Sequence, residues 1–288
     1  MPKPLSTIDS ALRVEPVSDG FAAIVSGIDL ATVAASPLAE RVRALHRDYP
    51  VLAFADQKLT AADFAGFSRV FGDLEIDEHL PQFAHPDHRE VIILSNVDTD
   101  GRPDPESAGR GAAWHADSTY KPNPCAHTLL YALEIPDRGG GTLFADMVRA
   151  YETLPDDIKA RIEGRSARHL FGSGPAEGGV APLGDDQHDL LPAVEQPVVI
   201  RHPDTGRQAL RVNPLHTVGI VGLERSESDA LLKTVFDHAT KPDFVYHHHW
   251  RVGQLVIWDQ RCTMHRAEAA YPMDQRRRLL RTKICGAH

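Results

Sequence analysis

Residues 114–117 read Trp-His-Ala-Asp, and residues 259–266, far downstream, read Asp-Gln-Arg-Cys-Thr-Met-His-Arg. His115 and Asp117 are two positions apart, so on a β-strand both side chains would project from one face and could bind one metal ion. A second histidine from a partner strand would complete a set of two imidazoles and one carboxylate. Such a set leaves coordination positions open and suits non-haem Fe(II) and oxygen chemistry. The His-x-Asp pair alone is weak evidence, because a solvated His and Asp in a surface turn give the same pattern.

The composition is that of an ordinary globular protein: 288 residues, 42% hydrophobic, 25% charged, with a formal net charge of −9. Nucleic-acid binding is disfavoured, because a surface that follows phosphates needs an excess of Lys and Arg. No apolar stretch approaches the roughly 20 residues of a membrane span, and residues 1–10 lack the core of a secretion signal. We therefore expect a cytoplasmic protein without a membrane partner. Its three cysteines, Cys125, Cys262 and Cys285, show no Cys-x-x-Cys spacing and are expected to be free thiols.

Short strands dominate the predicted secondary structure. Strands are expected at 21–25, 51–54, 91–94, 127–134, 142–146, 196–201, 209–212, 244–250, 255–258 and 279–284, and helices at 38–47, 61–71, 150–164 and 226–240. Many short strands with a few helices, and no strand–helix–strand alternation, favour a jelly-roll barrel with helical decoration. No internal repeat or Pro/Ser linker divides the chain, so a single domain over residues 1–288 is predicted.

Two polar, glycine-rich segments, 98–111 and 172–191, are expected to be loops. The first lies directly upstream of the His-x-Asp pair. It is either a simple surface excursion or a lid over the site.

Seven motifs together resemble the Fe(II)/2-oxoglutarate-dependent dioxygenases of the taurine dioxygenase and dichlorophenoxyacetate dioxygenase group. They are FAAIVSGIDL, FSRVFGDLE, WHADSTY, GGGTLFADM, HATKPDFVYHHHW, VIWDQRCTMHRA and RRRLLRT, and they cover nearly the whole chain. The resemblance implies a double-stranded β-helix (jelly-roll) core, Fe(II) as the metal, and 2-oxoglutarate and dioxygen as cosubstrates. It implies His115, Asp117 and His265 as the metal ligands. It also implies a small anionic substrate, and we expect a homo-oligomer.

The same resemblance assigns the cosubstrate and substrate contacts. Thr142 and Arg277 match the residues that bind 2-oxoglutarate, and a planar guanidinium is suited to a carboxylate because it pairs through two parallel hydrogen bonds. Arg281 matches the arginine that holds the anionic group of the primary substrate. Spacing by four is expected to put Arg277 and Arg281 on one strand face. Arg276 remains a competitor for the role of Arg277, and a solvated basic patch remains the alternative for all of these arginines.

Departures from the taurine enzymes point to the substrate. Asp77 and Leu80 stand where a His and a Tyr bind the amino-sulfonate, and Gly111 replaces an Asn before the metal ligand. A more apolar pocket with one anion clamp favours an aryloxyalkanoate-type ether, hydroxylated and then cleaved. A taurine, alkylsulfonate or alkyl sulfate dioxygenase is the alternative on the same scaffold. His79 could add a polar contact, although an exposed His in an acidic stretch is an equal reading.

Rival interpretations rest on less. His247 and His249 alternate onto one face and could bind a metal, yet histidines at the rim of a strand are the simpler reading. A catalytic cysteine has no support beyond the presence of histidines. A Zn or Mn hydrolase could use the same triad. A non-catalytic, metal-binding jelly-roll sensor is the alternative from another class, but it would not need a cosubstrate clamp such as Thr142 and Arg277.

Overall fold

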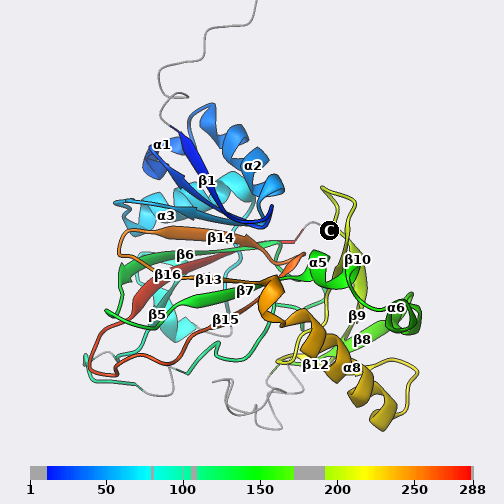
Figure 1. Cartoon of the computed structure of the whole chain (residues 1–288). Coiled ribbons are helices and arrows are strands. Elements are labelled where there is room, and N and C mark those ends of the chain that lie inside the picture. Colours follow the sequence, from blue (N-terminus) through cyan, green and yellow to red (C-terminus); the bar gives the residue numbers. More distant parts are fainter. Residues whose placement is uncertain (1–11, 79–80, 99, 105–108, 172–191, 287–288) are drawn as a thin grey trace, which may run out of the picture.

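Two β-sheets lie at the centre of the molecule (Figure 1). The structure is a computed structural model, and it describes residues 12–78, 81–98, 100–104, 109–171 and 192–286. The larger sheet has the order β1 (Arg13–Ser18), β2 (Ala22–Ser26), β3 (Val51–Phe54), β14 (Leu255–Asp259), β6 (His127–Glu134), β16 (Arg278–Ile284), β5 (His88–Ser95) and β4 (Ala84–His85). All neighbours are antiparallel except β2 and β3. The facing sheet has the order β13 (Val245–His248), β7 (Thr142–Asp146) and β15 (Thr263–Ala267).

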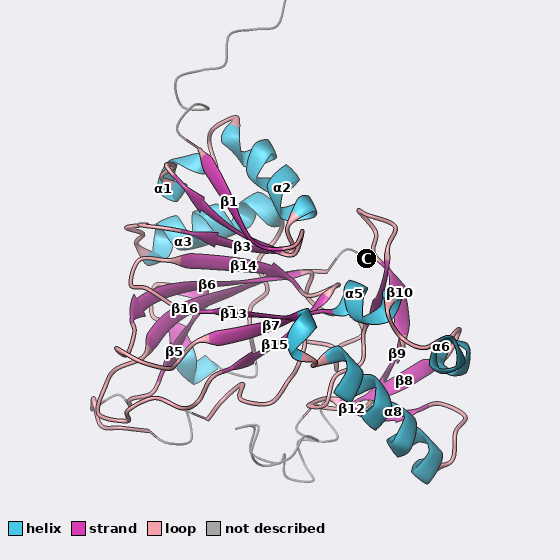
Figure 2. Ribbon diagram, viewed as in Figure 1, coloured by secondary structure: helices cyan, strands magenta, loops and turns pink. Residues whose placement is uncertain are grey.

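Helices and two small sheets flank this core (Figure 2). The helical elements before the His-x-Asp pair are α1 (Leu30–Val33), α2 (Leu38–Asp48), α3 (Ala61–Ser68) and the 3-10 turns η1 (Arg69–Phe71) and η2 (Pro81–Phe83). The later elements are α5 (Met147–Glu152), α6 (Asp156–Ile162), α8 (Arg225–Ala239), η4 (Pro242–Phe244), the sheet β12 (Thr217–Ile220), β8 (Ser166–His169), β9 (Val194–Pro197), and the hairpin of β10 (Val199–Arg201) with β11 (Gln208–Leu210). The predicted jelly-roll core with flanking helices is confirmed.

Alternation along β6 and β14 separates two environments. Leu129 and Ile257 face outward into a core shared with α2 and α3, whereas Leu130 and Trp258 face inward toward the second sheet. The inner cluster includes Phe144 of β7, whose ring meets that of Trp258 edge to face at 5.3 Å between centroids. Because side chains alternate strictly along a strand, the outer and inner sets cannot exchange without a register shift.

One helix prediction is wrong. The expected helix at 150–164 is two helices, α5 and α6, separated at Pro155. Proline has no backbone N–H and restricts the residue before it, so a helix usually ends ahead of it. Accordingly, α5 ends at Glu152, and Pro155 directly precedes the first residue of α6, where a missing backbone N–H costs no helical hydrogen bond. Within the described part of the chain, no helix has both the length and the apolar character to cross a membrane.

Four histidines buried outside the group of His115, Asp117 and His265 make stability depend on pH. Burial lowers the pKa of His46 to about 3 and the pKa of His127, His169 and His248 to about 4. Between pH 6.5 and about 4 the unfolded chain therefore binds more protons than the folded one, so stability falls as pH falls. Each such histidine lowers the free energy of unfolding by up to about 1.4 kcal/mol for each unit by which the pH falls in this range.

We predict that the free energy of unfolding of the metal-free protein, measured in urea, decreases steadily from pH 7 to pH 5. In the His169→Phe variant, the unfolding free energy should change less steeply with pH, because about one proton fewer is taken up on unfolding. An unfolding free energy that stays constant over this range would contradict the buried, neutral state of these histidines.

Candidate active site

His115, Asp117 and His265 converge inside the barrel. Backbone hydrogen bonds join His115 and His265 in both directions, with N···O distances of 2.9 and 2.7 Å, and their rings lie 4.2 Å apart between centroids. Nε2 of His115 is 3.6 Å from Oδ1 of Asp117. One donor atom from each of the three residues lies within 4.8 Å of the others. The three residues that the sequence singled out therefore form one group.

The His-x-Asp pair does not lie on a regular strand, the arrangement that would place both side chains on one face by alternation. His115 makes an isolated β-bridge with His265, and the chain turns at once, with Ser118 in the left-handed region at φ 59°. Asp117 therefore comes next to His115 through the turn rather than by strand alternation. Such a turn depends on contacts from other parts of the chain, which the local pattern does not show.

Two side chains hold the carboxylate of Asp117. Thr128 Oγ1 and Gln260 Nε2 donate to its Oδ2 at 2.7 and 2.8 Å, and Gln260 Oε1 accepts the backbone N–H of Asp117 at 3.0 Å. Burial would raise the pKa of Asp117, but the neighbouring His265 and His115 hold it well below its usual range. Burial lowers the pKa of His265 to about 3, so its imidazole is neutral and able to ligate. Both effects favour metal binding, which needs a carboxylate and neutral imidazoles.

Aromatic rings surround the group on the inside of the barrel. The rings of Trp258 and Phe144 lie 4.8 and 6.3 Å from that of His265, between centroids. His216 lies 6.4 Å from His115 and 4.9 Å from Tyr120, both in edge-on geometry. Sequence reasoning missed His216, because it lies between strands in a segment without a motif.

Thr142 and Arg277 both adjoin the glycine turn at residues 139–141. Thr142 begins β7 and accepts a hydrogen bond from Trp250 Nε1 at 2.9 Å. Arg277 Nε donates to the carbonyl of Gly140 at 2.9 Å, two residues before Thr142. Burial lowers the pKa of Arg277, yet none of the described carboxylates pairs with its guanidinium. A buried cation without a counter-charge is costly, so this position favours an anionic ligand.

The arginine triplet separates in space. The Arg276 side chain is 59% exposed and its Nη1 lies 3.9 Å from Glu134 Oε2, whereas Arg277 is inside. The expectation that Arg277 and Arg281 share a strand face is wrong, because β16 begins at Arg278 and its register shifts between Arg278 and Leu279. Arg277 is held instead by Asn96, whose Oδ1 accepts its backbone N–H at 2.8 Å.

Arg281 ends a chain of alternating charges. Its Nη2 lies 3.0 Å from Asp77 Oδ2, and Lys283 Nζ lies 3.0 Å from the same oxygen. Lys283 and Lys121 then each lie 2.7 Å from Glu75 Oε1. The five residues carry three positive and two negative charges. Arg281 is thus partly neutralised from within, although its buried Nε has no hydrogen-bond partner in the described part of the protein.

Of the remaining expected positions, Gly111 lies beside the metal group and the others are outside the described residues. His79 and Leu80, the segment 172–191 and residues 99 and 105–108 of the first loop lie outside the described residues. Gly111 has φ 75°, and a Cβ there would lie 3.5 Å from Cε1 of His115. This left-handed conformation beside the metal group favours glycine.

The rival sites gain no support. His247 Nε2 lies 3.3 Å from Glu268 Oε2, and its ring lies 4.0 Å from that of His249, but no three metal-binding donors meet there among the described residues. Cys125 and Cys262 are buried free thiols, and Cys285 is exposed. Burial raises the pKa of Cys125 to about 12 and that of Cys262 well above its usual range, so neither is a thiolate nucleophile.

Comparison with known proteins agrees with this geometry. The profile of the "Taurine catabolism dioxygenase TauD, TfdA family" matches residues 13–283. The (S)-phenoxypropionate/alpha-ketoglutarate-dioxygenase of Sphingobium herbicidovorans is 34% identical over 96% of this chain and 96% of its own. The alpha-ketoglutarate-dependent 2,4-dichlorophenoxyacetate dioxygenase of Cupriavidus pinatubonensis is 34% identical over 92% and 95%. The crystal structure of AAD-2 in complex with Mn(II) and N-oxalylglycine superposes with a TM-score of 0.83 at 31% identity, over 96% of this chain and 99% of the other.

Fold and sequence together define a 2-oxoglutarate-dependent dioxygenase, an oxidoreductase. The chain belongs to the TauD/TfdA family. Fe(II), 2-oxoglutarate and dioxygen, the cofactor and cosubstrates implied by the sequence resemblance, follow from this membership.

We predict that Thr128→Val weakens Fe(II) binding by roughly 10–100-fold, the usual cost of losing a hydrogen bond to a metal ligand. The change keeps the side-chain shape but removes the donor to Asp117. Fe(II) affinity of the metal-free protein is the measurement. Thr282→Val is the matched control, because this buried hydroxyl contacts Ser68 at 2.8 Å on the opposite face of the sheet. Equal Fe(II) affinity in wild type and Thr128→Val would show that Thr128 does not support the metal ligand.

Proposed function

We propose that this dioxygenase hydroxylates a small carboxylate-bearing substrate, an aryloxyalkanoate, and that the ether bond breaks after hydroxylation. Two relatives that share about a third of its residues along nearly the whole chain are named for phenoxypropionate and dichlorophenoxyacetate. The observation that supports the use of 2-oxoglutarate is the Arg277 guanidinium, which lies partly buried beside the Gly140 turn without a described carboxylate partner. It is suited to a dicarboxylate such as 2-oxoglutarate.

His115, Asp117 and His265 fit the metal that the family uses. They offer two imidazole nitrogens and one carboxylate oxygen from one side, a donor set typical of non-haem Fe(II). Bound there with 2-oxoglutarate and dioxygen, Fe(II) would supply the oxidising power that converts a C–H bond into an alcohol. Thr128 and Gln260 keep the Asp117 carboxylate turned toward the two histidines.

Arg277 and Thr142 are proposed to orient 2-oxoglutarate. The guanidinium would pair with one carboxylate of the cosubstrate, and the Thr142 hydroxyl would contact the same group. Trp250 Nε1 already donates to Thr142 Oγ1, so the hydroxyl proton of Thr142 remains free to donate to an anion. Arg277 is partly buried, and desolvation of its guanidinium strengthens such a pair.

Arg281 is proposed to bind the carboxylate of the primary substrate. The alternating chain that it ends has one positive charge in excess, which a monoanion would neutralise. His216 lies beside His115, Tyr120 packs against His216, and the two rings offer aromatic surface for an aryl ring. Substrate carboxylate and ring would then bracket the carbon that carries the ether oxygen.

Hydroxylation at that carbon explains cleavage. The product carries a hydroxyl and an aryloxy group on one carbon, which makes it a hemiacetal. The hydroxyl proton moves to the aryloxy oxygen as the C–O bond breaks, releasing a phenol and an oxo acid. Succinate and carbon dioxide would be the products of the cosubstrate.

A substrate screen tests the proposal. With Fe(II), 2-oxoglutarate and oxygen, aryloxyacetates and aryloxypropionates should give phenol and succinate in equal amounts, and should do so faster than taurine or alkyl sulfates. Arg281→Leu should lower kcat/KM for the aryloxyalkanoates by roughly 10²-fold, the scale of about 3 kcal/mol for a hydrogen bond to a charged group. Binding of 2-oxoglutarate should persist in this variant. Preference for sulfonates or sulfates, or an unchanged kcat/KM in Arg281→Leu, would overturn the substrate assignment.

The neighbouring arginines provide a matched pair for the cosubstrate. Arg277→Ala should raise the KM for 2-oxoglutarate strongly, because breaking a partly desolvated charge pair costs about 2–5 kcal/mol. Arg276→Ala, one residue away but exposed, should leave that KM nearly unchanged. Steady-state succinate formation measures both. A larger effect from Arg276→Ala would move the cosubstrate clamp to Arg276.

A further inference from the structure

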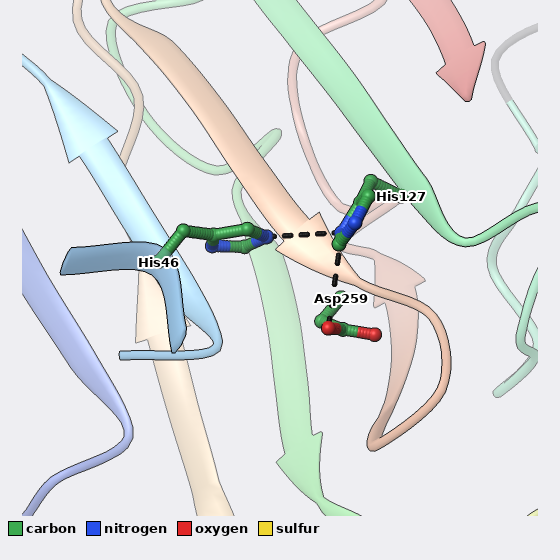
Figure 3. Close-up of side chains that lie close together, drawn as sticks. All are labelled: His46, His127 and Asp259. Atoms are coloured by element: carbon green, nitrogen blue, oxygen red, sulfur yellow. Dashed lines mark hydrogen bonds and ion pairs between the residues drawn. The ribbon is translucent and has the colours of Figure 1, made fainter. Parts of the chain in front are cut away.

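A second group of metal-binding side chains lies outside the dioxygenase site (Figure 3). It consists of His46 of α2, His127 of β6 and Asp259 of β14, all less than 9% exposed. His46 Nε2 lies 3.1 Å from His127 Nδ1, and His127 Nδ1 lies 3.8 Å from Asp259 Oδ2. The donor atoms of all three lie within 4.8 Å of one another.

This group occupies the opposite face of the sheet from the triad. His127 and Asp259 are cross-strand partners in β6 and β14. Their chain neighbours Thr128 and Gln260 point inward and hold Asp117. Because neighbouring residues of a strand face opposite sides, His127 points outward, toward α2. None of the three residues serves the proposed dioxygenase reaction.

Space and further donors adjoin the group. His202 Nε2 lies 3.0 Å from Asp259 Oδ2, and His202, Asp259 and Cys262 have donor atoms within 4.8 Å of one another. A cavity of about 40 Å³ is lined in part by His46, His202, Asp259 and Cys262. That volume exceeds the minimum for one water molecule. A fourth ligand, from His202 or from water, is therefore within reach.

Charges of both signs surround the group, with carboxylates in the majority: Asp48, Asp146 and Asp259 line the cavity together with Arg47 and Arg207. Arg261 pairs with two carboxylates, Asp259 at 2.6 Å and Asp204 at 2.8 Å, so one guanidinium faces two negative charges. Asp204 can retain the arginine if Asp259 turns to a metal. Burial lowers the pKa of His46 and His127, so both rings are neutral near pH 7, as ligands must be.

We infer that His46, His127 and Asp259 form a second binding site, for a divalent transition ion of the Zn²⁺ type. At a Zn–N distance of about 2.0–2.1 Å, tetrahedral ligand atoms lie about 3.3–3.5 Å apart. The observed spacings of 3.1 and 3.8 Å lie on either side of this value. The ion would be structural, since it would join α2 to β6 and β14. The competing arrangement is a simple hydrogen bond between the two rings.

Metal titration separates the two arrangements. The His115→Ala/His265→Ala double variant lacks the proposed iron site and serves as the background. Its metal-free form should still bind one equivalent of Co²⁺, with the strong visible absorption of a tetrahedral site, and one equivalent of Zn²⁺ by calorimetry. Zn²⁺ should also raise its melting temperature. A background variant that binds neither ion stoichiometrically overturns the inference.

Substitutions assign the ligands. His46→Gln in the same background keeps a donor for His127 but loses the imidazole ligand, so Co²⁺ affinity should fall at least about 100-fold. His127→Ala should do the same, and circular dichroism shows whether each variant remains folded. His169 is a buried histidine in β8, so His169→Gln is the matched control and should still bind one equivalent of Co²⁺. Undiminished Co²⁺ binding in folded His46→Gln would overturn the assignment.

Discussion

The reciprocal backbone hydrogen bonds between His115 and His265 are the constraint on which the site depends. They attach a segment without regular structure to β15, and a third bond, from the Ala267 N–H to the carbonyl of Gly111 at 2.7 Å, lies near them. Asp117 then reaches the same place only because the chain turns after His115 and because Thr128 and Gln260 bind its carboxylate. The proposed metal site is thus a short turn fixed from three sides, by β15, Thr128 and Gln260.

Two arginines four residues apart meet opposite electrostatic conditions. Arg277 is partly buried without a described counter-ion, so its charge favours an incoming anion. Arg281 already contacts Asp77, which belongs to a chain of alternating charges that ends near the barrel surface at Lys121. Burial would destabilise the charged form of Lys283, yet its acidic neighbours keep its pKa above the usual range. A single positive charge in excess, shared by five residues, leaves Arg281 more restrained in position and weaker as an anion receptor than Arg277.

Much of the core was predictable from local patterns, and much of the site was not. Strands β6 and β7 have the bounds expected from hydrophobic runs and the glycine turn, since both depend on burial and turn chemistry within a few residues. The turn at Asp117 depends on Thr128 and Gln260, and no local pattern reveals it. The contact between Asp77 and Arg281 joins segments far apart in the chain, so a sequence motif shows only one partner at a time. The break at Pro155 was readable, but the apolar spacing across it concealed the interruption.

In β6 and β14, neighbouring residues point to opposite faces of the sheet, so movements on the two faces are coupled. A peptide bond joins His127 to Thr128 and another joins Asp259 to Gln260, so a displacement of the outward pair also moves the inward pair. Asp117 would register that movement through its two hydrogen bonds. By thermodynamic reciprocity, if a metal ion bound on the outer face changes the affinity of the inner site for iron by some factor, iron bound at the inner site changes the affinity of the outer site by the same factor. Divergence at position 46 or 127 among related chains would then be a means of tuning iron affinity without touching an iron ligand.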